Sequence, residues 1–184
     1  MLRRDCLRGL GAQFMSRGGS AAKRKGSSFE RDVAQKLSEI TGESFIRAPG
    51  SGAYVGGKNA HRKEFLHEGQ IRTFKGDVVP GPSYSNWNIE CKSYADFPFH
   101  TLVAGKPVLP LDKWIDQMLD VEDEGDINLL FMKFNRKGTF VLYDPEYWES
   151  DTGILYKTDL PICTMCFDSF ERWIDLLQKR IGAA

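Results

Sequence analysis

Two neighbouring apolar segments with charged residues at fixed places constrain this chain more than any other feature. Asp77 lies in the first segment, 74–79, and Glu90 and Lys92 lie two residues apart in the second, 87–93. Side chains alternate between the faces of a strand, so Glu90 and Lys92 share a face. If the two strands pair through the Pro-, Gly- and Ser-containing loop between them, Asp77 lies beside Glu90. Two carboxylates next to an ammonium can hold a hard divalent cation and an activated water.

The charge of the chain is unevenly distributed, although Lys and Arg balance Asp and Glu overall. Residues 1–25 hold seven basic and one acidic side chain, a net of +6, and the rest holds 18 basic and 24 acidic, a net of −6. With 184 residues, 41% of them apolar, the chain has enough core for one domain. We expect a disordered basic arm over 1–25 and a domain over 26–184. The arm suits a polyanionic partner, and a solubilising leader has the same composition.

The few cysteines indicate a reducing compartment, and the hydropathy of the chain gives no sign of a membrane span. The chain has four cysteines, too few for a dense disulfide framework. Cys163 and Cys166 have the spacing of a zinc knuckle but lack two further ligands nearby, so we interpret them as ordinary thiols. No apolar run approaches the roughly 20 residues that span a bilayer. We expect a cytoplasmic protein, in the host cytoplasm if the source is viral. The basic leader also suits organellar import, and Met15 is an alternative start.

Apolar spacing predicts the order of helices and strands. A first helix is expected from Phe29, Val33 and Leu37, with Ser27 or Ser28 as its N-cap and Gly42 as its end. The remaining expected elements are a strand at 44–47, a long loop at 49–72, strands at 74–79 and 87–93, an irregular connection at 95–110, a helix at 111–122, a hairpin of strands 127–134 and 139–143, and a helix at 167–181. Residues 145–166 stay unassigned. This order predicts a single α/β domain with a central mixed sheet flanked by helices.

Residues around the motif resemble a known family. Glu30 in the first helix, Gly76-Asp77 and Glu90-x-Lys92 follow one another as in the PD-(D/E)XK nuclease superfamily. Segments 25–31 and 45–51 extend the likeness over residues 25–95 and are similar to the archaeal-type Holliday junction resolvases. Gly76 stands where the family name has Pro, and an insertion at 52–73 separates the two halves of the motif.

The resemblance implies a restriction-endonuclease-like domain that hydrolyses DNA phosphodiesters with Mg²⁺ or Mn²⁺. Asp77, Glu90 and the main-chain carbonyl of Cys91 would hold the metal, and Glu30 would bind it directly or through water. Lys92 would orient the attacking water and neutralise charge in the transition state. The substrate would be branched DNA such as a four-way junction. A homodimer would follow, because a junction needs two symmetric cuts.

Basic and small residues near the motif are candidates for contacts with DNA phosphates. They are Arg47, Ser51, Lys58, Arg62, Lys63, Arg72 and Lys75. The resemblance favours Arg47 and Ser51, whose matching positions lie beside the metal site, and a solvated loop explains the others equally well. Gln117 matches a supporting glutamine of some related nucleases and is equally compatible with a polar surface.

Two other functions stay open at this point. The first is another nuclease of the same fold, a recombination or repair exonuclease or a restriction-type enzyme. The second is a catalytically silent DNA-binding protein, which the intact set of Asp77, Glu90 and Lys92 argues against.

Overall fold

Two apolar strands, β3 (Trp87–Tyr94) and β4 (Ile127–Phe134), form the centre of the computed structural model, which describes residues 18–49, 75–149, 153–157 and 164–183. They pair in parallel along their whole length, with Trp87 opposite Ile127 and Tyr94 opposite Phe134. Their side chains are buried over most of this length, as expected for a parallel pair covered on both faces.

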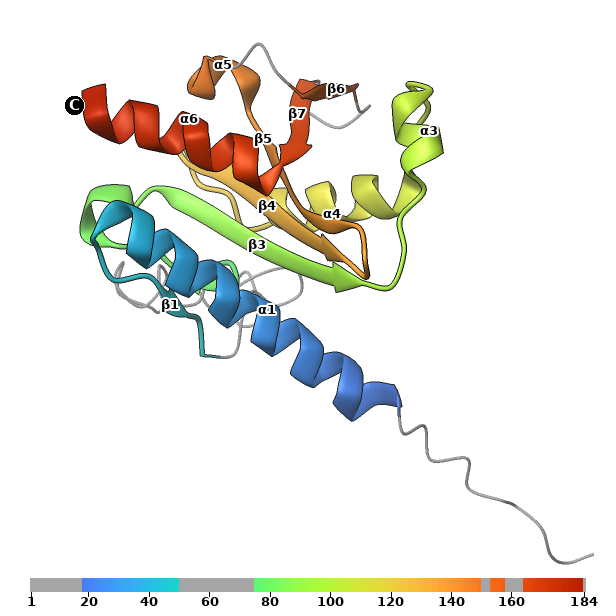
Figure 1. Ribbon diagram of the computed structural model, residues 1–184, viewed down its shortest axis with the longest axis horizontal. Helices are drawn as coiled ribbons and strands as arrows, with labels where there is room; N and C mark the ends of the chain where they lie inside the picture. The colour runs from blue at the N-terminus through green and yellow to red at the C-terminus, as the bar shows by residue number, and fades with distance from the viewer. Residues whose placement is uncertain (1–17, 50–74, 150–152, 158–163, 184) are drawn as a thin grey trace, which may run out of the picture.

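Antiparallel strands complete the sheet, whose order is β3-β4-β5-β7-β6 (Figure 1). These strands are β5 (Gly138–Tyr143), β6 (Ile154–Lys157) and β7 (Thr164–Ser169). The turn between β4 and β5 places Arg136 at φ 60° and Gly138 at φ 102°. The prediction of one central mixed sheet is therefore confirmed.

Helices cover both faces of this sheet and separate two hydrophobic cores. Helices α1 (Gly18–Thr41) and α6 (Phe170–Ala183) pack on the face that carries Ile89 and Cys91 of β3. Helices α3 (Phe99–Val103) and α4 (Leu109–Leu119), which connect β3 to β4, pack on the other face. The fold is thus the α/β, restriction-endonuclease-like domain that was expected. No helix in the described ranges is long and apolar enough to cross a membrane.

A small two-stranded unit lies against the free edge of β3. Strands β1 (Ile46–Arg47) and β2 (Val78–Val79) pair antiparallel, with Arg47 opposite Val78. The turn η3 (Pro82–Tyr84) then leads into β3, and α5 (Pro145–Trp148) follows β5. Because β2 has only two residues, the contact with β3 depends on the residues immediately before it.

Several predicted boundaries are wrong for identifiable reasons. The first helix begins at Gly18, because the run of Ala, Lys and Arg at 21–25 favours helix and Ser27 and Ser28 are accommodated inside it. Its end at Gly42 is confirmed, with φ 74° at that residue. The connection 95–110, expected to be irregular, contains α3. The last helix begins at Phe170, three residues after the predicted start at 167, because 164–169 form β7. The predicted loop 49–72 lies almost entirely outside the described residues.

Candidate active site

Asp77 is placed beside β3 by two backbone contacts and a glycine. Its amide donates to the carbonyl of Ile89 at 2.7 Å, and its carboxylate Oδ2 accepts from the amide of Cys91 at 2.9 Å. Gly76 has φ 68°, and a Cβ added there would lie 2.5 Å from the carbonyl oxygen of Ile89. Only glycine therefore allows this close approach, which explains why glycine precedes the aspartate.

Glu90 lies between Ile89 and Cys91 in β3 and is almost completely buried, with 1% of its surface exposed. Burial, and after it the negative charge of Asp77, raise the pKa of Glu90 to about 8, against the lowering effect of the Lys92 ammonium. The two acids are thus close enough to repel each other in a dry environment. The expected placement of Asp77 next to Glu90 is present in the fold.

Lys92 shares the face of Glu90, as the alternation of side chains in a strand predicted. Its Nζ lies 3.3 Å from Oε2 of Glu90 and donates to Oε1 of Gln117 at 2.8 Å. Gln117 comes from α4, which covers this face of the sheet. The sequence alone left Gln117 equally compatible with a polar surface, and its contact with Lys92 requires the packing of α4 on β3.

A third acid, Glu30, approaches from α1. Its Oε2 forms an ion pair with Nε of Arg47 at 2.5 Å. Burial and the charge of Asp77 raise the pKa of Glu30 above its usual value, against the lowering effect of Arg47. Burial also raises the pKa of the Cys91 thiol, with further increases from the charges of Asp77, Glu90 and Glu30. The three acids therefore surround one segment of β3.

This arrangement fits a hard divalent cation that keeps part of its water shell. Among the described residues, no three His, Cys, Asp or Glu side chains form a ready-made metal cage. Mg²⁺ in proteins is commonly held by one or two carboxylates plus water and substrate phosphates. Asp77 and Glu90 supply such a pair, and their mutual repulsion is a reason for a cation to bind there.

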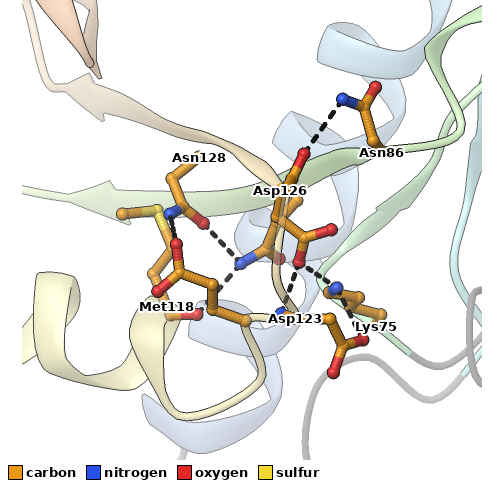
Figure 2. Close-up of polar contacts among 9 residues, drawn as sticks. Lys75, Asn86, Met118, Asp123, Asp126 and Asn128 are labelled. Carbon is orange, nitrogen blue, oxygen red and sulfur yellow. Dashed lines mark hydrogen bonds and ion pairs between the residues drawn. The ribbon is translucent and has the colours of Figure 1, made fainter.

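A polar network fixes the segment before Asp77 (Figure 2). Lys75 is 9% exposed, and its Nζ forms ion pairs with Asp126 and, at 2.9 Å, with Asp123. Both aspartates belong to the turn between α4 and β4. Lys75 was expected to contact DNA. In the structure its ammonium instead forms the two ion pairs with Asp123 and Asp126.

The residues on either side of this turn, at the end of α4 and the start of β4, also hold β3 in place. Asn88, two residues before Glu90, donates to Oδ1 of Asn128 at 2.8 Å and to the carbonyl of Met118 at 3.0 Å. Asn128 in turn donates to Glu122 at 2.6 Å. The turn between α4 and β4, together with the residues that flank it, is therefore a common anchor for the segments that carry Asp77 and Glu90. Sequence reasoning missed it because its partners are far apart in the chain.

Several predicted residues lie outside the described part of the chain. They are Ser51, Lys58, Arg62, Lys63, Arg72 and Cys163. Their suggested contacts stay predictions. Arg47 lies at the site through its ion pair with Glu30, and Cys166 is buried in the core.

The geometry supports hydrolysis of a phosphoester by a bound water. Two acids can hold a cation, an ammonium lies beside them, and a glutamine orients that ammonium. A family model described as "Phage putative PDDEXK endonuclease" matches residues 21–171. No curated protein and no solved structure shows significant similarity to the chain.

Proposed function

The chain belongs to the phage PDDEXK endonuclease family, and from this premise we propose that it cleaves branched DNA in a reaction that depends on Mg²⁺ or Mn²⁺. The observation that carries the proposal is the buried carboxylate of Glu90, which lies beside Asp77 and within 3.3 Å of the Lys92 ammonium. A buried acid with a second acid next to it is costly unless a cation compensates it.

Each residue of the site has a role in this reaction. Asp77, Glu90 and the carbonyl of Cys91 would hold the cation, and Glu30 would complete the site directly or through water. When bound, the cation stabilises negative charge on the phosphate and lowers the pKa of water. Lys92 orients the attacking water and offsets the charge on the pentacovalent phosphorus, and Gln117 keeps the Lys92 ammonium in place. The water oxygen bonds to phosphorus as the bond to the leaving sugar oxygen breaks.

Conservative substitutions test the chemistry. We expect Asp77→Asn, Glu90→Gln and Lys92→Met to abolish Mg²⁺-dependent cleavage of DNA while DNA binding is largely kept. Cleavage is measured on labelled DNA with Mg²⁺, with Mn²⁺ and with chelator, and binding is measured by fluorescence anisotropy. Glu39→Gln, an exposed acid on α1, is the matched control. Unchanged cleavage by the Asp77 and Glu90 variants would refute the assignment of the active site. Absence of cleavage in all of the preparations, wild type included, would favour a DNA-binding protein without nuclease activity.

The choice of a branched substrate rests on the resemblance of residues 25–95 to junction resolvases, and it is tested separately. A mobile four-way junction is compared with linear duplex, single-stranded and flapped DNA. Paired symmetric nicks in the junction, made by a homodimer in sedimentation experiments, support the resolvase activity. Digestion that starts from the ends of linear DNA would instead assign the same site to an exonuclease, and sequence-dependent cuts in duplex DNA would assign it to a restriction-type enzyme.

A further inference from the structure

A cavity of about 310 Å³ lies at the end of β3, and the proposed chemistry makes no use of it. Its lining includes Tyr94, Phe97, Leu109, Lys113 and Trp114. The volume is near the small end of the range for pockets that bind small ligands. The cavity therefore suits one planar group better than a large ligand.

Stacked aromatic rings form the wall of this cavity. The rings of Tyr94 and Trp114 are 4.8 Å apart with an interplanar angle of 30°, and Trp114 is followed by Phe97 at 6.1 Å and 28°. Exposure falls from 48% at Tyr94 to 7% at Trp114 and 4% at Phe97. Tyr94 is thus the outer end of a stack whose inner rings are held by the core.

The cavity is next to the candidate active site. Glu90, Lys92 and Tyr94 lie on one face of β3 at successive alternate positions, so Tyr94 is roughly 7 Å beyond Lys92 along the strand. On α4, Lys113 is one turn before Gln117, which contacts Lys92. A DNA strand with its phosphate at Lys92 would bring the neighbouring nucleotide to this wall.

We propose that this cavity binds one unpaired nucleobase next to the phosphate that is cut. A paired base has both faces covered by its neighbours, whereas an unpaired base can stack on Tyr94. Lys113 is exposed and supplies the positive charge that a flanking phosphate needs. The acid of the cavity wall, Asp96, is neutralised by Lys137 at 2.5 Å. The inference rests on the proposed nuclease activity and specifies its substrate as DNA with an unpaired nucleotide at the cut.

The test compares the binding of two DNAs that differ only in whether the unpaired nucleotide carries a base. In the Asp77→Asn background, which leaves the DNA uncut, the Kd is measured for a duplex with an unpaired thymidine and for the same duplex with an abasic site there. The unpaired position is moved one nucleotide at a time. We expect one position at which the abasic DNA binds about five- to 150-fold more weakly, the range for stacking of one base on an aromatic side chain.

Variants of Tyr94 assign this difference to the cavity. Tyr94→Ala should make the two DNAs bind equally, and Tyr94→Phe should keep the difference. Leu155→Ala, an exposed apolar residue on β6 at the opposite edge of the sheet, is the control and should also keep it. The comparison of the two DNAs in the Asp77→Asn protein, where Tyr94 is intact, remains a valid test even if the Tyr94 variants do not fold.

Three results would overturn the inference. Equal binding of the two DNAs at every position excludes a base site, and an equal loss for both DNAs in Tyr94→Ala indicates a general role in folding or phosphate binding. A change of oligomeric state in Tyr94→Ala without any change in base discrimination makes the cavity a contact between copies of the chain. Cleavage by the Asp77→Asn protein would instead overturn the proposed function, so the two failures are distinguishable.

Discussion

At the scale of single residues, Glu90 makes the stability of the metal-free protein depend on pH. Its pKa is raised from 4.5 to about 8 in the folded chain, so the folded state binds more protons than the unfolded state between these values. The free energy of unfolding should therefore fall as pH rises from about 4.5 to 8. Urea denaturation with chelator over this range measures the slope, and Mg²⁺ should reduce the loss at pH 8 by binding the folded state.

The variant Glu90→Gln should separate stability from activity. A neutral amide avoids the burial of a charge beside Asp77, so we expect the metal-free variant to be more stable than wild type at pH 8 and to have a smaller pH slope, with the part due to Glu30 remaining. Cleavage should be lost in the same protein. Glu39→Gln, at an exposed position, should leave both the slope and the cleavage unchanged. A Glu90→Gln protein less stable than wild type at pH 8 would contradict the view that the buried charge of Glu90 destabilises the metal-free protein.

Gly76 is the residue that allows Asp77 to approach β3. Gly76→Ala adds a Cβ 2.5 Å from the Ile89 carbonyl oxygen, so the segment that carries Asp77 must move away. Gly105→Ala is a matched control, because Gly105 has a similar φ of 65° but nothing within 4 Å of the added Cβ. Both variants should lose about 1–2 kcal/mol from the left-handed backbone. Only Gly76→Ala should lose more than this and bind Mn²⁺ more weakly, as measured by calorimetry; equal effects would refute the role of close approach.

At the scale of elements, the turn between α4 and β4 holds both acid-bearing segments. Lys75→Met removes the partner of Asp126, which is 9% exposed, and should lower the free energy of unfolding by about 3–5 kcal/mol. Lys133→Met breaks the exposed pair with Asp32 and should lower it by at most about 1 kcal/mol. Urea denaturation measures both. Similar small losses in the two variants would show that the buried pair is no anchor.

Some elements could be predicted from the sequence because their signal is local. The face shared by Glu90 and Lys92 follows from the alternation of a strand, and the buried face of α1 follows from the spacing of Phe29 and Leu37. Strand β7 was missed because it buries residues on both faces and lacks alternation. Lys75 was misinterpreted because its partners are 48 and 51 residues away and only the fold brings them together.

At the scale of the whole molecule, charge differs between the two ends of β4. The segment before β4 holds Glu122, Asp123, Glu124 and Asp126, whereas Lys133 lies near the far end of β4 and Arg136 and Lys137 lie in the turn after it. Lys25 of α1 also reaches this turn, where its Nζ donates to Oδ1 of Asn135 at 2.5 Å. Tyr94 lies at the same end, because β3 and β4 run parallel. We therefore expect DNA to approach from the basic end.

This approach predicts a change in the salt dependence of DNA binding. In the Asp77→Asn background, the double variant Lys133→Gln and Arg136→Gln should reduce the slope of log K against log salt by up to roughly 0.9 for each phosphate that the protein no longer neutralises. Lys157→Gln with Lys179→Gln, exposed lysines of β6 and α6, is the control with the same change of net charge. Equal slopes for the two double variants would mean that net charge alone governs binding.

The hydrogen bonds of Asp77 to Ile89 and Cys91 have a second consequence, because β3 is an edge strand of the five-stranded sheet. A strand edge with free amides and carbonyls is a template for aggregation, and Asp77 occupies part of that edge. Substituting alanine at Asp77 would free the Cys91 amide, whereas asparagine keeps an acceptor for it. We therefore expect Asp77→Ala, but not Asp77→Asn, to self-associate, so solubility and cleavage share one contact in this protein.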